Sequence, residues 1–219
     1  MKQLVIVGNG PYSQMMKKYV EQTGFGEALA YTVGAAYIQK EEMDGVPVLP
    51  LEKLRETFPC DRVSLVLGIG YRRMGEIRRE VFGACRQYGY RFENYVHPTA
   101  LIAKDVEMGE GNNILEGVIL EAGAKIGDAN LFFGGSMVAH ETTVGSYNTF
   151  SVRAVAAGCA AIKDHCFLGA SSVVRDHVAL EDYVLLGAGA YGFKDMDPYS
   201  VVMPAKSILL TDKKSTDFL

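Results

Sequence analysis

Hydrophobic residues in the first 95 positions form short runs that alternate with amphipathic segments. Residues 4–7 and 63–67 are fully apolar, as expected of strands buried on both faces of a parallel sheet. Residues 13–22 carry apolar side chains at helical spacing, with Gly24 just past the end. The same criteria predict a strand near 28–33, an extended piece at 46–49, and helices at 51–58 and 71–88, the last with arginines on its exposed side. This alternation predicts a small, Rossmann-like parallel α/β sheet.

After residue 95 the hydrophobic pattern changes to a strict period of six. Counted in steps of six from Val96, all sixteen positions up to Leu186 are apolar. They are Val96, Ile102, Met108, Ile114, Leu120, Ile126, Phe132, Val138, Val144, Phe150, Ala156, Ile162, Leu168, Val174, Leu180 and Leu186. With 48% hydrophobic residues in the chain, chance produces such a run on the order of once in 10⁵.

The residue four positions after each of these is small, β-branched or Asn. One large and one small inward residue in every six is typical of a parallel β-helix, in which three hexads form one triangular coil of 18 residues. Gly and Asn tolerate the left-handed backbone that corners can require. We therefore expect an α/β domain at 1–95, a β-helix of about five coils at 96–191, and a C-terminal tail at 192–219.

Composition excludes several classes of protein. The formal net charge is −4 and the pI about 5.6, which argues against a general nucleic-acid binder. No apolar run reaches the length of a membrane span, and the first residues lack the features of a secretory signal, so we expect a cytoplasmic location. The four cysteines form no CxxC pair and are expected to be free thiols. The chain has no tryptophan, which fits a narrow core.

Several motifs accompany the repeat. They are Val7-Gly8-Asn9-Gly10, Val96-His97-Pro98-Thr99-Ala100, Val138-Ala139-His140-Glu141, Gly187-Ala188-Gly189-Ala190 and Pro204-Ala205-Lys206. With these motifs, the chain resembles bacterial hexapeptide-repeat sugar acetyltransferases, which have a left-handed β-helix. The nearest group contains sialic acid O-acetyltransferases and nucleotide-linked amino-sugar N-acetyltransferases. Departures from that group include Tyr12, Glu141-Thr142 and Thr149, where its members commonly have His, Asp-Cys and a second His.

Acetyl transfer needs a base, a donor to the oxyanion and a slot for pantetheine. The resemblance implies that His140 is the general base. One coil of 18 residues beyond His140 lies Gly158, whose bare backbone suits close approach of a thioester and whose N–H is a candidate oxyanion donor. Glu141 either orients the imidazole through a hydrogen bond or is a solvated acid.

The resemblance also implies acetyl-CoA as co-substrate, bound in a groove between two β-helices. We expect Gly158, Ala170 and Ala188 to form a smooth wall of this groove and Lys206 to approach the nucleotide phosphates. A groove of this kind requires neighbouring subunits, so a homotrimer is predicted. No catalytic metal and no nucleic-acid partner are implied.

A nucleotide-linked or other sugar acceptor is expected on the N-terminal domain. Backbone N–H groups of Gly8, Asn9 and Gly10 can hold a phosphate at a helix N-terminus, and Arg72 and Arg73 can meet a diphosphate. Residues 1–95 carry 13 basic and 11 acidic side chains, against 5 and 11 for residues 96–191. The less acidic N-terminal domain is the better site for an anion. A solvated basic helix face is the alternative interpretation of the arginines.

Two rival functions remain open at this point. A γ-class carbonic anhydrase would need three histidines converging on zinc, and His140, His165 and His177 occupy different positions in their hexads. A non-catalytic β-helical scaffold or assembly protein is the other alternative. We expect Asn130 and Asn148 to order corners, His97 to fix the first coil, and both His165 and His177 to be exposed.

Overall fold

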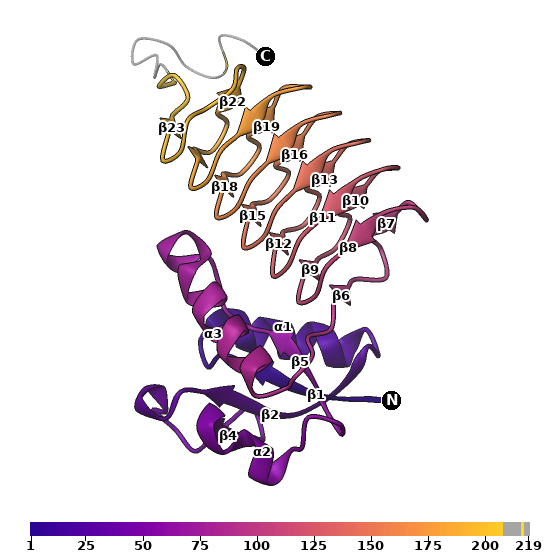
Figure 1. Cartoon of the computed structure of the whole chain (residues 1–219), viewed down its shortest axis with the longest axis vertical. Coiled ribbons are helices and arrows are strands. Elements are labelled where there is room, and N and C mark those ends of the chain that lie inside the picture. The colour runs from indigo at the N-terminus through magenta and orange to yellow at the C-terminus, as the bar shows by residue number, and fades with distance from the viewer. Residues whose placement is uncertain (208–215, 217–219) are drawn as a thin grey trace.

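The computed structural model describes residues 1–207 and residue 216, and shows two domains joined at one end of a long β-helix (Figure 1). The N-terminal domain has a sheet of order β3-β4-β2-β1-β5. Its strands are β1 (Lys2–Val7), β2 (Gly26–Val33), β3 (Glu42–Met43), β4 (Val46–Pro50) and β5 (Ser64–Leu67). The pairs β1–β2, β1–β5 and β2–β4 are parallel, whereas β3 is an antiparallel addition at the edge that the sequence did not predict.

The helices of this domain begin and end close to their predicted limits, with one exception. They are α1 (Pro11–Gln22), η1 (Ala35–Tyr37), η2 (Leu51–Lys53), α2 (Leu54–Thr57), η3 (Arg72–Gly75) and α3 (Glu76–Gln87). The single helix expected over 71–88 is interrupted, because Arg73, Met74 and Gly75 all have left-handed backbone with φ of 51°, 51° and 84°. The expectation of exposed arginines also fails at Arg78, which is completely buried.

The second domain is a left-handed parallel β-helix with three faces (Figure 1), as predicted. The junction face, which meets the N-terminal domain, contains β6 (Tyr95–Val96), β9 (Asn113–Ile114), β12 (Leu131–Phe132), β15 (Thr149–Phe150), β18 (Phe167–Leu168), β21 (Leu185–Leu186) and β23 (Val201–Val202). The apolar face contains β7 (Leu101–Ile102), β10 (Ile119–Leu120), β13 (Met137–Val138), β16 (Val155–Ala156), β19 (Val173–Val174) and β22 (Tyr191–Gly192). The polar face contains β8 (Glu107–Met108), β11 (Lys125–Ile126), β14 (Thr143–Val144), β17 (Ala161–Ile162) and β20 (Ala179–Leu180).

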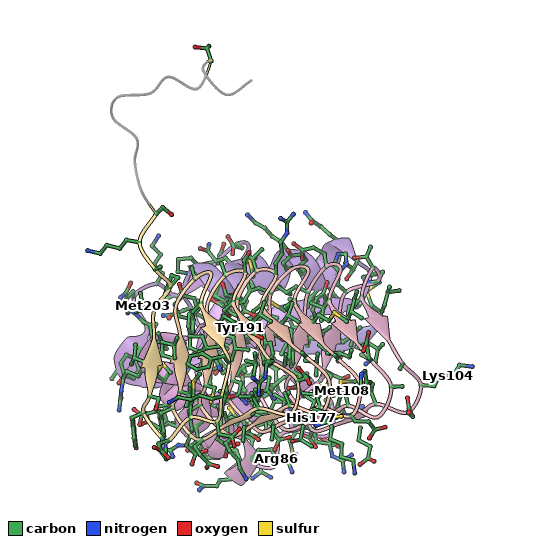
Figure 2. The ribbon with its side chains drawn as sticks, turned by 90° about the horizontal axis from the view of Figure 1, so that it is seen from above. Arg86, Lys104, Met108, His177, Tyr191 and Met203 are labelled. Carbon is green, nitrogen blue, oxygen red and sulfur yellow. The ribbon has the colours of Figure 1, made fainter. Side chains whose placement is uncertain are left out.

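Strands on one face pair in register with residues one coil, or 18 positions, along the chain, for example Met137 with Val155. The second residue of most strands points inward, so the apolar residues of the period-six pattern form one continuous core. The coil does not stop at the predicted boundary, since β23 adds a strand to the junction face within the expected tail. Figure 2 shows Lys104 at the first-coil end of the β-helix and Met203 at the other.

The corners differ from the expectation in one respect. The left-handed backbone falls on the fourth residue of every hexad from Gly111 to Gly189, with φ between 54° and 74°, and nine of these fourteen residues are not glycine. The fifth residues, among them Asn112, Asn130 and Asn148, face inward and form a buried ladder. Asn130 donates to Asn112 Oδ1 (3.0 Å) and accepts from the Asn148 N–H (2.8 Å). The asparagines therefore support the corners through side-chain hydrogen bonds.

The N-terminal domain docks on the junction face through buried polar contacts. Asn113 donates to the Leu67 carbonyl at the end of β5 (2.6 Å) and to the Tyr12 hydroxyl (3.0 Å). The Tyr12 ring packs against Phe133 with a centroid separation of 5.8 Å. The carboxyl ends of β1 and β5 consequently lie against the β-helix, where ligands commonly bind in open α/β sheets.

Candidate active site

His140 lies at the corner between β13 and β14, which joins the apolar face to the polar face and is here called the apolar–polar corner. Its side chain is exposed, and its backbone N–H donates to Glu121 Oε2 (2.9 Å). The imidazole lies directly against Gly158, at the same corner position one coil later. A methyl group at Gly158 would stand only 2.5 Å from both Cε1 and Nε2 of His140. The bare backbone expected from the spacing of 18 is therefore in contact with the ring.

The Gly158 N–H donates to no acceptor within residues 1–207. Its carbonyl accepts from the His177 N–H (3.1 Å), and the neighbouring Cys159 N–H donates to the His140 carbonyl (2.9 Å). The difference between the two corners is local. The His140 N–H donates to the side chain of Glu121, whereas the residue one coil beyond Glu121, which precedes Gly158 in the same way, is Ala139 and has no side-chain acceptor. A free N–H beside an imidazole can receive negative charge that develops there.

Glu141 points away from His140. Its carboxylate lies against Gly123, one coil before, where it would overlap a methyl group, whereas the imidazole lies against Gly158, one coil after. No hydrogen bond joins the two side chains among the residues described. This placement gives no support to the predicted orienting role of Glu141 and matches the solvated acid that we considered beside it.

A shallow groove of about 480 Å³ runs from His140 across β7 and β10, the first two strands of the apolar face. Its walls are mostly aliphatic and include Leu101, Ile119 and Leu120. The outward side chains of this face are Leu101, Ile119, Met137, Val155, Val173 and Tyr191, and the first and last are 65% and 51% exposed. The four between them are half-buried. An apolar strip of this kind at the surface marks an interaction site.

Ala170 and Ala188 do not lie on the same edge as Gly158. They follow β18 and β21, at the corner from the junction face to the apolar face, here called the junction–apolar corner. Gly158 follows β16, at the opposite edge of the apolar face. The prediction of one smooth wall from these three residues is therefore wrong within one chain, because a step of 12 residues crosses two faces of the triangle. Lys206 is exposed beyond β23 and forms no ion pair with described residues.

The proposed acceptor residues meet at the carboxyl edge of the N-terminal sheet. Gly8 has φ 123° and packs so closely on the Gly68 carbonyl that a methyl group would lie 2.7 Å from it. The Asn9 amide donates to the Tyr37 carbonyl (2.8 Å), and Gly10 is the N-cap of α1 and faces open space. Arg73 is paired with Glu76 at 2.8 Å.

Arg72 lies in η3, two residues beyond Gly70, and forms no ion pair within residues 1–207. Tyr12 lies in the first turn of α1, between these loops and the β-helix, where burial raises the pKa of its phenol above the usual value. Tyr12 thus stays a neutral hydroxyl, with its oxygen accepting from the Asn113 amide.

The sequence analysis missed the roles of two residues at the junction. Arg78 donates to the carbonyls of Gly70 (3.1 Å), Asn148 (3.0 Å) and Tyr147. Burial lowers the pKa of its guanidinium to about 10, so it remains charged at neutral pH. His165, which we expected to be exposed, is only 4% exposed, whereas the side chain of His177 is 73% exposed, as predicted. Helical periodicity of α3 could have placed Arg78 inward, but nothing in the hexads distinguishes His165 from His177.

Two further observations bear on the expectations. No helix within the described part of the chain is long and apolar enough to cross a bilayer. The three histidines considered for zinc are separated, because His165 lies at the corner between the polar and junction faces and His140 and His177 lie at the apolar–polar corner. Among residues 1–207 and 216, no group of three His, Cys, Asp or Glu side chains is placed to hold a metal ion.

No family model and no curated protein sequence matches the chain. Solved structures match over nearly its whole length. The acetyltransferase domain of PglB from Neisseria gonorrhoeae FA1090, also solved with acetyl coenzyme A, is 18% identical with a TM-score of 0.83, covering 95% of this chain and 100% of that one. PerB from Caulobacter crescentus, in complex with CoA and GDP-perosamine, is 24% identical with a TM-score of 0.81, covering 93% and 95%.

WeeI from Acinetobacter baumannii AYE is 20% identical to this chain, with a TM-score of 0.81 and coverage of 93% of this chain and 97% of that one. The similarity to these three proteins extends over both domains rather than over the β-helix alone. The resemblance inferred from the sequence is thus confirmed at the level of the fold: this chain has the same two-domain architecture as these three proteins, a small α/β domain followed by hexapeptide-repeat coils.

Proposed function

We propose that the protein is an acetyl-CoA-dependent acetyltransferase that acts on an amino or hydroxyl group of a sugar, most simply a nucleotide-linked sugar used in bacterial surface-glycan synthesis. The observation that carries this proposal is the contact between the His140 imidazole and the bare backbone of Gly158, whose N–H donates to no acceptor within residues 1–207. Solved proteins of the same fold support it, since they include the acetyltransferase domain of PglB with acetyl coenzyme A and perosamine N-acetyltransferase from Caulobacter crescentus with CoA.

The two residues divide the chemistry between them. His140 removes the proton from the acceptor nitrogen or oxygen as that atom attacks the thioester carbonyl. The Gly158 N–H donates to the oxyanion of the tetrahedral intermediate, and because no acceptor for it lies within residues 1–207, it is free to do so. Collapse of the intermediate breaks the carbon–sulfur bond. His140 then donates the proton it took from the acceptor to the departing thiolate, so that CoA leaves as the thiol.

The apolar face supports the predicted homotrimer. A three-fold arrangement with this face turned inward buries the strip from Leu101 to Tyr191. The same arrangement sets the apolar–polar corner of one protomer beside the junction–apolar corner of the next. Gly158 of one chain would then lie across a groove from Ala170 and Ala188 of its neighbour, which restores the predicted wall from two subunits. The aliphatic groove beside His140 fits the pantetheine arm of acetyl-CoA.

The docking of the N-terminal domain supports an acceptor site near the same groove. The Tyr19 hydroxyl of α1 donates to Glu116 (2.8 Å), and Tyr12 packs on Phe133; both partners lie at the junction–apolar corner. In the trimer, an acceptor held by the Gly8–Gly10 turn of one protomer would face His140 of the next. The structure of PerB contains GDP-perosamine. A nucleotide sugar of that class suits an anion-binding site at the carboxyl edge of the N-terminal sheet.

The test is release of CoA thiol from acetyl-CoA in the presence of a panel of UDP-, dTDP- and GDP-linked amino sugars. We expect turnover with at least one acceptor and its loss in His140→Ala. Full activity of His140→Ala would show that the base is wrongly assigned. Absence of thiol release with every acceptor, together with absence of acetyl-CoA binding, would favour the β-helical scaffold instead. The separation of the histidines gives the carbonic anhydrase alternative no support.

A further inference from the structure

The connection between β5 and α3 is held in an unfavourable backbone conformation. Arg73 and Met74 are left-handed at φ 51°, and neither residue is glycine. Left-handed backbone is unfavourable for any residue with a Cβ, because that atom approaches the following carbonyl oxygen. Conformations of this kind persist only where the surroundings determine them, and they are common at ligand-binding sites. The segment from Gly70 to Gly75, here called the 70–75 loop, is therefore held by other parts of the molecule.

The β-helix supplies most of the contacts that hold the loop. The ring nitrogen Nδ1 of His165 lies 2.9 Å from the Met74 carbonyl. Because a carbonyl oxygen only accepts, Nδ1 must carry the proton and donate it. At the other end of the loop, Arg78 donates to the Gly70 carbonyl while also bonding the coil at Asn148. Gly75 lies so close to the Tyr147 carbonyl that no side chain would fit there.

His165 is itself fixed by aromatic stacking. Its ring lies between Tyr147 (centroids 5.1 Å apart, planes 17° apart) and Tyr183 (4.7 Å, 5°). Tyr183 stacks in turn on Tyr199 (4.9 Å, 8°). These residues occur at intervals of 18 and 16, so the coil repeat itself builds the stack. Stacking on both faces fixes the plane of the ring, and within that plane Nδ1–H is directed toward the Met74 carbonyl.

The loop that His165 holds carries Arg72 and Arg73 at the carboxyl edge of the sheet. This edge also contains the Gly8–Gly10 turn, since Gly8 packs on Gly68 and Gly70 lies beside Tyr12. Ligands of open α/β sheets bind in the crevice beyond the carboxyl ends of the strands. The conformation of the 70–75 loop thus decides where the guanidinium of Arg72, which forms no ion pair with residues 1–207, lies relative to an anion bound at that turn.

We propose that His165 is a positioning residue for the acceptor: through the Met74 carbonyl it holds the 70–75 loop in the conformation that binds the diphosphate of a nucleotide sugar. This inference rests on the proposed function. It assigns to the β-helix, far along the chain from the N-terminal domain, control over the affinity of the nucleotide site. Since His165 touches neither His140 nor the apolar face, it should leave acetyl-CoA binding unaffected.

Two variants separate the hydrogen bond from the stack. His165→Phe keeps an aromatic ring between the tyrosines but removes the donor. His165→Asn loses the outer part of the ring but keeps an N–H donor near the position of Nδ1, and Asn accepts left-handed backbone well. His177→Phe is the matched control, because His177 has the same corner conformation (φ 58°) and faces solvent.

Binding of UDP, dTDP and GDP, and separately of acetyl-CoA, is measured by isothermal titration calorimetry on each full-length variant, with melting temperatures as a check on folding. We expect His165→Phe to weaken the best-bound nucleotide about tenfold, the change produced when the binding-competent loop falls to about a tenth of the population. His165→Asn and His177→Phe should stay within about twofold of wild type. Acetyl-CoA affinity should be unchanged in all three.

Three results would overturn the inference: unchanged nucleotide affinity in His165→Phe, equal losses for nucleotide and acetyl-CoA in that variant, or a larger loss in His165→Asn than in His165→Phe. Failure of the proposed function looks different. In that case the wild-type protein itself binds no nucleoside diphosphate and turns over no acceptor, so both proposals fall together. If the wild-type protein is active and His165→Phe binds the nucleotide normally, only the positioning role of His165 is ruled out.

Discussion

The contact between Gly158 and His140 predicts that a single methyl group strongly lowers the proposed acetyltransferase activity. In Gly158→Ala the new Cβ would stand 2.5 Å from Cε1 and Nε2 of the imidazole. The backbone itself can accept the change, since Gly158 does not have a positive φ and Ala122 occupies the same corner position two coils earlier. The substitution therefore acts on the ring and not on the fold.

The size of the effect follows from the geometry. Ordinary contact begins at 3.4 Å, so the imidazole must move by about 0.9 Å or rotate away. His140 is exposed and can rotate without meeting the core, so the cost in unfolding free energy should stay below about 1 kcal/mol. A displacement of about 1 Å from the reactive geometry costs about 100-fold in rate. We expect kcat/KM to fall about 100-fold while stability changes little.

The assay combines thiol-release kinetics with thermal unfolding in a double-mutant cycle of Gly158→Ala and His140→Ala. If the methyl group acts by displacing the ring, the destabilisation caused by Gly158→Ala should disappear when the ring is already absent. The kcat/KM of the double variant should be no lower than that of His140→Ala alone.

Two outcomes would refute this reasoning. Gly158→Ala retaining more than half of the wild-type kcat/KM would show that the position of the ring against Gly158 has no role in catalysis. A stability loss of the same size in both backgrounds would show that the methyl group disturbs the coil itself and not His140.

Three further predictions follow from other parts of the molecule. At pH 8 iodoacetamide should label only Cys60 and Cys159 among the four cysteines, because burial raises the pKa of the Cys85 and Cys166 thiols to about 12 and keeps them protonated. Mass spectrometry of the labelled protein should show that acetyl-CoA protects Cys159 but not Cys60. Val155→Glu on the apolar face should yield monomers in sedimentation analysis, whereas Ala161→Glu on the polar face should not; a trimeric Val155→Glu would contradict the interface. Asn130→Ala should lower the unfolding free energy by about 2–4 kcal/mol in urea titrations, because its buried hydrogen-bond partners lose their acceptor and donor; a loss below about 0.5 kcal/mol would rule out the ladder as a source of stability.

Much of the fold could be predicted because its rules are local and repeated. One large and one small inward residue per hexad recur sixteen times, and the structure places these residues in a single core. The same arithmetic predicted that Gly158 lies one coil beyond His140, since parallel strands of a β-helix pair at a fixed offset. It failed for Ala170 and Ala188, because an offset of 12 changes the face of the triangle.

Interactions between the domains could not be predicted in this way. His165 and His177 occupy equivalent positions in their hexads, yet only His165 lies at the corner on which α3 docks, and it is buried there between two tyrosines. Arg78 appeared to belong to a solvated helix face, but packing against the coil turned it inward. The break at Arg73 and Met74 also depends on that packing, since no local preference favours left-handed backbone at either residue.

The sequence by itself thus determined the β-helix, its coil offset and the pairing of His140 with Gly158, because each depends on spacing along one chain. Tertiary structure alone decided which corner meets the N-terminal domain, which histidine is buried, and how the 70–75 loop is held. The physical reason is that these features depend on how the α/β domain packs on one of three faces. Because the repeat makes every coil alike, it contains no information about which face the α/β domain contacts.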